Sequence, residues 1–171
     1  MGALFGGAAT AKIPSDFLDA STLREVPDHQ EVYVGMLQED DISVIIELLE
    51  PVEKPNLTEA LVYHIDETHR VSDTKKDEIE VPVEVLTMDF HDREYVERID
   101  IVKSKSLPTS LVFGLIRLAE YNTDVLITCI LNRRSAAPVS QLDEAQTQAE
   151  IVRNIAKSFQ IVDPKLFQEE Q

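Results

Sequence analysis

The sequence predicts an α+β fold in which about six mainly antiparallel strands form a sheet flanked by helices. Three observations support this prediction: short segments that alternate apolar and polar residues, turn residues between neighbouring segments, and two longer segments with apolar residues at helical spacing. The chain of 171 residues is long enough to bury a core without disulfides. We therefore expect a single domain over residues 1–171.

The first part of the chain predicts strands followed by a helix. Residues 8–13 follow a pair of glycines and predict a first strand, with which the sheet should begin. Residues 32–34 are β-formers, and the β-branched run 42–48 predicts a strand with one buried face. Residues 56–68 carry apolar side chains at helical spacing, and Asn56 can cap the start of this helix.

The second part predicts two hairpins. Residues 82–90 and 98–105 alternate apolar and polar side chains, so we expect them to pair through a connection over residues 91–97. Residues 111–119 and 124–131 are more apolar and should form a second hairpin in the middle of the sheet. Their connection contains Asn122, a residue that tolerates a positive φ.

The remaining segments predict a loop, a linker and a long helix. Residues 68–81 are polar and predict a surface loop, and residues 133–141 contain Pro138 and predict a linker. A stripe at helical period then predicts a helix with these apolar positions: Leu142, Ala145, Ala149, Val152, Ile155 and Phe159. We expect the following side chains in the core: Ile45, Leu111, Phe113 and Phe159.

The charge of the chain limits its partners. The formal net charge is −16, from 32 acidic and 16 basic side chains. Nucleic acids and anionic membranes are therefore poor partners, and a basic protein surface is the natural complement. Residues 1–50 hold ten carboxylates against two basic side chains, so half of the net charge lies in this part of the chain.

Cysteine usage and hydropathy predict the compartment. Cys129 is the only cysteine, which excludes an intrachain disulfide and favours a reducing environment, and its apolar neighbours predict a buried, inert thiol. The sequence opens with no basic region followed by an apolar run, and no stretch approaches the roughly 20 apolar residues of a membrane span. We expect a soluble protein of the nucleus and cytoplasm.

The sequence shows no convincing catalytic set, metal set or phosphate-binding loop. Gly6-Gly7 lacks the spacing with which a P-loop surrounds phosphate. His64 and His69 would lie about 140° apart on a helix, which is poor geometry for one metal ion. We therefore expect no cofactor and no metal.

A charged connection precedes the strand at residues 32–34. It contains Arg24, Glu25, Asp28 and Glu31, and Pro27 stiffens it. Such a connection is often only a solvated turn whose carboxylates accept backbone hydrogen bonds. Acid–base catalysis by its paired carboxylates would need an apolar pocket to raise one pKa, and no such pocket is expected on an open turn. Contacts to lysines of a partner would need only exposure and position.

Several sequence segments together resemble the Mog family, the Ran guanine nucleotide release factors of nuclear transport. They occur in order along the chain: Leu-Phe-Gly-Gly-Ala (4–8), Val-Pro-Asp-His-Gln-Glu-Val-Tyr (26–33), Ile-Ile-Glu-Leu-Leu-Glu (45–50), Tyr-His-Ile-Asp (63–66) and Leu-Ile-Arg-Leu-Ala-Glu-Tyr-Asn-Thr-Asp-Val (115–125). The resemblance extends to residue 167 and is weakest over residues 71–107 and 133–141. His29 departs from the small polar residue that is usual in the family.

The resemblance implies a non-enzymatic protein that binds Ran, promotes release of its guanine nucleotide and regulates nuclear protein import. It implies that Asp28 and Glu31 form the acidic interaction site and that Arg24 and Glu25 orient or extend it. We further expect a monomer, with other Ran-binding proteins as the only additional partners. The predicted layout is also similar to the photosystem extrinsic subunit (PsbP-like) fold, so a ligand carrier or scaffold without a GTPase partner is the alternative. A hydrolase that uses Asp28 and Glu31 is a second alternative.

Overall fold

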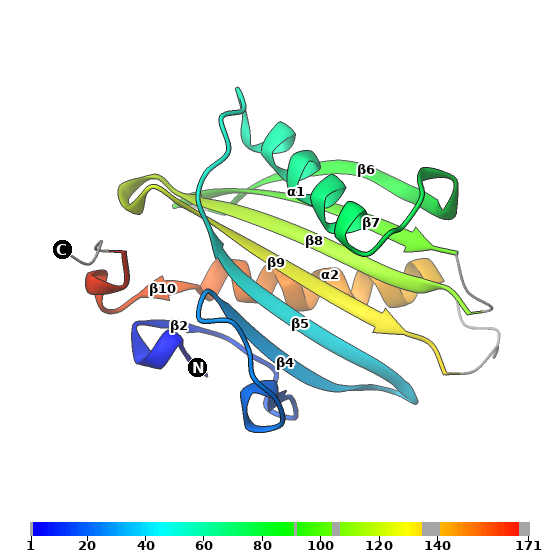
Figure 1. Cartoon of the computed structure of the whole chain (residues 1–171), viewed down its shortest axis with the longest axis horizontal. Helices are drawn as coiled ribbons and strands as arrows, with labels where there is room; N and C mark the ends of the chain where they lie inside the picture. The colour runs from blue at the N-terminus through cyan, green and yellow to red at the C-terminus, as the bar shows by residue number, and fades with distance from the viewer. Residues whose placement is uncertain (1, 91, 104–106, 135–140, 168–171) are drawn as a thin grey trace.

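The computed structural model describes residues 2–90, 92–103, 107–134 and 141–167 (Figure 1). Its large sheet has seven antiparallel strands, in the spatial order β3 (Leu18–Asp19), β4 (Gln30–Leu37), β5 (Asp40–Leu49), β9 (Thr123–Asn132), β8 (Thr109–Leu118), β7 (Arg93–Val102) and β6 (Ile79–Phe90). A small sheet contains β1 (Gly2–Leu4), β2 (Ala9–Ala11) and β10 (Gln160–Ile161). The α-helices are α1 (Leu57–Val71) and α2 (Gln141–Ser158).

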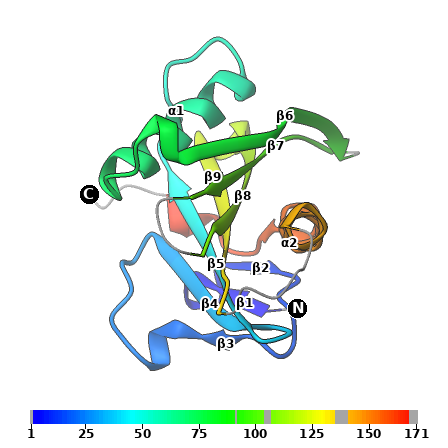
Figure 2. The same ribbon diagram turned by 90° about the vertical axis from the view of Figure 1, so that its right-hand side faces the viewer.

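The two helices lie on opposite faces of the large sheet (Figure 2). Successive side chains of a strand point to opposite faces, so each central strand supplies both layers of the core. Leu61 and Ile65 of α1 pack with Phe113 of β8 in one layer. Val152 of α2 packs with Tyr95 of β7 in the other layer, which also includes side chains of the small sheet.

Most of the predicted elements are confirmed. The side chain of Asn56 accepts a hydrogen bond from the N–H of Glu59 at 2.9 Å and so caps α1. Asn122 has a φ of 49° in the connection between β8 and β9, and β9 is the central strand of the seven. The predicted stripe of α2 is buried from Ala145 to Phe159, whereas Leu142 is 42% exposed and lies outside the core.

Two predicted boundaries and one sheet assignment are wrong. The first hairpin is tight, because β7 begins at Arg93 and not at residue 98. Its first residues do not alternate in hydropathy, since Tyr95 and Val96 point to opposite faces and helices cover both. The predicted loop 68–81 is also shorter, because α1 continues to Val71 and β6 begins at Ile79. The predicted first strand, β2, belongs to the small sheet, so the large sheet begins only at β3.

The core prediction is confirmed for Leu111, Phe113 and Phe159 and is wrong for Ile45. Ile45 is only half-buried, because α1 packs mainly on β8 and β7. The predicted linker 133–141 lies mostly outside the described residues. In the described parts of the chain, neither helix combines the length and the hydropathy that crossing a membrane requires.

Candidate interaction site

The charged connection, residues 24–31, links the short 3₁₀ helix η2 (Ala20–Thr22) to β4. The carbonyl of Pro27 accepts a hydrogen bond from the N–H of Gln30 at 3.0 Å, which places Asp28 and His29 at the corner of a turn. The carbonyl of His29 accepts a second bond from the N–H of Leu48, also at 3.0 Å. The turn is therefore anchored to β5 as well as to β4.

Three of the four predicted site residues are exposed on this connection. Arg24, Glu25 and Asp28 all lie at the surface. Their side chains form no hydrogen bond or ion pair with another residue that the structure describes. The anchored turn thus presents Asp28 with its full hydrogen-bonding capacity facing solvent.

Glu31, the fourth predicted site residue, is in a different environment. Its side chain is half-buried, and Oε1 accepts a hydrogen bond from the backbone N–H of Phe5 at 2.6 Å. Phe5 has a φ of 52°, and Gly6 and Gly7 continue in positive φ through the 3₁₀ helix η1 (Phe5–Gly7). The expectation of an open, solvated position is therefore wrong for Glu31, which holds the N-terminal segment against β4.

Two pKa values in this region are raised. Burial raises the pKa of Glu31 most, the hydrogen bond from Phe5 opposes this effect, and the charge of Asp19 adds to it. Burial, together with the charges of Glu31 and Asp19, raises the pKa of Tyr33 to about 12. The expectation that no carboxyl of the connection has a raised pKa is therefore wrong, because the N-terminal segment packs against Glu31 and helps to bury it.

Replacement of Glu31 by Gln should leave the fold intact and make stability less dependent on pH. The raised pKa means that folding favours the protonated form of Glu31 relative to the unfolded chain, so its contribution to stability is complete below about pH 4 and is lost as pH rises through the folded pKa. The side-chain amide of the substituted glutamine can still accept the Phe5 hydrogen bond through its oxygen. Relative to wild type, Glu31→Gln should gain under about 1 kcal/mol between pH 4 and pH 7, since solvent screens a half-buried group.

Urea unfolding at both pH values measures this gain. Asp28→Asn is the matched control, because it removes an exposed carboxylate that accepts no hydrogen bond from a described residue. A relative loss of stability in Glu31→Gln as pH rises would contradict the assignment.

Among the described residues, two buried charge clusters lie between α1 and the sheet, and sequence reasoning missed both. Asp100 accepts hydrogen bonds from Arg98 at 2.7 and 2.8 Å, and His69 Nε2 of α1 lies 2.7 Å from Asp100 Oδ2. Arg117 binds Asp124 in the same way at 2.7 and 3.0 Å, and His64 Nε2 lies 3.8 Å from Asp124 Oδ2. We call these clusters the helix clamps, because each places a histidine of α1 beside a buried aspartate of the sheet.

The electrostatics of the helix clamps favour ionised aspartates. Burial alone would raise the pKa of Asp100, but hydrogen bonds from His69 and Arg98 outweigh it and lower the pKa below its usual value. Burial would also raise the pKa of Asp124, but His64, 3.8 Å away, and the two hydrogen bonds from Arg117 lower it. Among the described residues, no three potential ligands are grouped as a metal site would require.

Cys129 is buried, as predicted. Burial raises the pKa of its thiol to about 12, despite an opposing contact from Gln148. A thiol is a poor nucleophile until it ionises, so Cys129 belongs to the packing between β9 and α2.

These observations define a class: an α+β protein that presents exposed charges on an anchored turn, an arrangement suited to contacts with another macromolecule. The family of Ran-interacting Mog1 proteins matches residues 2–132, and the chain belongs to this family. The matched range includes the charged connection and both helix clamps.

Known proteins similar to this chain have names that agree with the family. "Nuclear import protein MOG1" of Saccharomyces cerevisiae is 33% identical over 180 residues, which cover 96% of this chain and 83% of that protein. The human "Ran guanine nucleotide release factor" is 28% identical, and the matched region covers 96% of this chain and 94% of the human protein. The crystal structure of the Saccharomyces cerevisiae Ran-binding protein Mog1p superposes with a TM-score of 0.81 at 28% identity, over 96% of each chain. The resemblance and the fold class are confirmed.

Proposed function

We propose that this chain binds the small GTPase Ran, promotes release of its guanine nucleotide and so takes part in nuclear protein import. The observation that carries the proposal is membership of the Mog1 family, whose relatives include proteins named Ran guanine nucleotide release factor. The relatives named nuclear import proteins support the link to the nucleus.

The proposed mechanism is differential binding without covalent chemistry. A GTPase holds its nucleotide chiefly through phosphate contacts from a lysine, backbone amides and Mg²⁺. A partner that prefers the state in which these contacts are broken shifts the population toward release. Linkage makes the effect reciprocal, so bound nucleotide weakens the partner's affinity by the same factor.

The proposed contact surface is the charged connection. Asp28 is its central residue, because it is exposed at the corner of a turn that two strands hold in place. Glu31 adds a second carboxylate, whose Oε2 forms no hydrogen bond with a described residue, and Arg24 and Glu25 extend or orient the patch. Basic groups of Ran near its phosphate-binding region are the complementary surface.

The proposal also covers the domain organisation, oligomeric state, localisation and partners of the protein. Residues 1–171 form one Ran-binding domain that acts as a monomer in the nucleus and cytoplasm, requires no cofactor and does not bind nucleic acid or membrane. The net charge of −16 supports the last point, since nucleic acids and anionic lipids carry charge of the same sign. Other Ran-binding proteins would join as further members of the complex.

Stopped-flow release of a fluorescent guanine nucleotide from Ran tests the proposal. Addition of this chain should accelerate release to a saturating rate, and the chain should bind nucleotide-free Ran more tightly than loaded Ran. An unchanged release rate together with no affinity for nucleotide-free Ran would refute it and would favour a carrier or scaffold role.

A further inference from the structure

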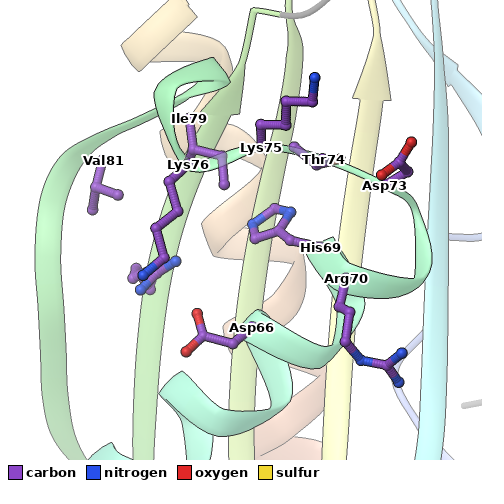
Figure 3. Close-up of a pocket in the computed structure, with 10 residues that line it drawn as sticks. Asp66, His69, Arg70, Asp73, Thr74, Lys75, Lys76, Ile79 and Val81 are labelled. Carbon is purple, nitrogen blue, oxygen red and sulfur yellow. The ribbon is translucent and has the colours of Figure 1, made fainter.

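A cavity of about 720 Å³ lies at the C-terminal end of α1, remote from the charged connection. It is open to solvent, and the end of α1, the following segment 72–78 and strands β6 and β7 line it (Figure 3). His69 and Arg70 extend from α1 on one side, and Ile79 and Val81 lie on the β6 side. Its volume is typical of a site for a small molecule.

The lining of this cavity is basic in an acidic protein. Arg70, Lys75, Lys76 and Arg98 contribute four cationic side chains against the carboxylates of two others, Asp66 and Asp73. Arg70 is paired with Glu67 and Arg98 with Asp100, whereas the two lysines form no ion pair with a described residue. The chain has only 16 basic residues in all, so four of them at one cavity are a local concentration of cationic side chains. At physiological salt, interactions between exposed charges are screened beyond about 8 Å. The carboxylates of the charged connection, at the opposite edge of the sheet, therefore have little influence on these cationic side chains.

Arg98 is the fixed cation of the cavity. The helix clamp holds its Nε and Nη2 on Asp100, and its side chain is only 14% exposed. Nη1 forms no hydrogen bond with a described residue, which leaves it able to donate to a ligand. The exposed Lys75 and Lys76 form no ion pair with a described residue and can close over the same ligand.

The end of a helix normally repels anions, because its last carbonyls are unpaired. At this end the carbonyls of Thr68, His69 and Arg70 accept hydrogen bonds from the backbone N–H groups of Ser72, Thr74 and Asp73 respectively. These bonds satisfy the carbonyls nearest the cavity and reduce the local negative potential.

We propose that this cavity binds a small organic phosphate. A planar, pre-oriented guanidinium beside lysines suits a phosphate group, which accepts several charge-assisted hydrogen bonds. Ile79 and Val81 offer an apolar wall to the organic part, and Asp66 offers an acceptor to its hydroxyl groups. The five strand spacings from β4 to β6 span about 24 Å, so this site does not depend on the proposed contact with Ran.

Isothermal titration of the whole chain with ribose 5-phosphate, inorganic phosphate and ribose tests the proposal. We expect saturable binding of ribose 5-phosphate, weaker binding of phosphate and none of ribose. Lys76→Gln should weaken ribose 5-phosphate binding about fivefold, and Lys12→Gln, which changes an exposed lysine outside the cavity, should leave it unchanged.

Amide shifts in NMR spectra locate the site independently and should be concentrated at residues 74–81 and around Arg98. No saturable binding of ribose 5-phosphate, or equal weakening by both lysine variants, would overturn the proposal. Ran is absent from these measurements, so their failure would leave the nucleotide-release proposal intact, and the reverse also holds.

Discussion

Asp28→Lys should abolish the acceleration of nucleotide release from Ran while the free energy of unfolding stays within about 0.5 kcal/mol of wild type. Asp28 is exposed and binds no described residue, so the isolated fold loses nothing with it. Removal of one partner of a buried, hydrogen-bonded interfacial charge pair costs about 2–5 kcal/mol, or roughly 30-fold to several thousand-fold in affinity. Stopped-flow release and urea unfolding measure the two quantities.

Glu39→Lys is the matched control, since it changes the net charge equally at an exposed position between β4 and β5. It should mainly slow association at low salt, because long-range attraction is screened. Equal effects of the two substitutions would refute a specific patch. Glu31→Lys is less informative, because it also removes the acceptor of the Phe5 hydrogen bond.

Asp100→Ala should lower the free energy of unfolding by about 3–5 kcal/mol at pH 7, because it removes the shared partner of Arg98 and His69 in a buried cluster. Urea unfolding measures the loss. Asp89→Ala, at an exposed position of β6, is the control and should stay within about 0.5 kcal/mol of wild type.

The pH dependence of this loss has a definite sign. The pKa of native Asp100 is lowered, so its stabilising contribution is present above the unfolded value near 4 and disappears as pH falls through the folded value. The difference between wild type and Asp100→Ala should therefore shrink in acid below about pH 4. A difference that grows in acid, or a loss at pH 7 no larger than that of Asp89→Ala, would contradict the role of the helix clamp.

Local periodicity predicted most of the fold because strands and helices bury their apolar side chains at fixed spacing. The prediction failed where burial is decided by distant segments. The start of β7 was missed because helices cover both of its faces, and Ile45 was misplaced because the reach of α1 over the sheet is a tertiary property.

In the candidate site, too, features set by the local sequence could be predicted, whereas features set by distant segments could not. The exposure of Asp28 followed from Pro27 and the turn, which are local features. The environment of Glu31 depends on Phe5, 26 positions earlier in the chain, and no local pattern reveals that contact. Both helix clamps also join residues that are far apart in sequence, although the close spacing of Arg98 and Asp100 was a signal that could have been used.

The bond from the Phe5 amide to Glu31 gives one carboxylate two competing uses. If a lysine of a docking protein binds Glu31 Oε1, the backbone N–H of Phe5 loses its hydrogen-bond acceptor. That N–H must then bind water or another oxygen. Docking at this residue and loss of the Phe5 hydrogen bond would then be two sides of a single exchange, while β1 stays paired with β2.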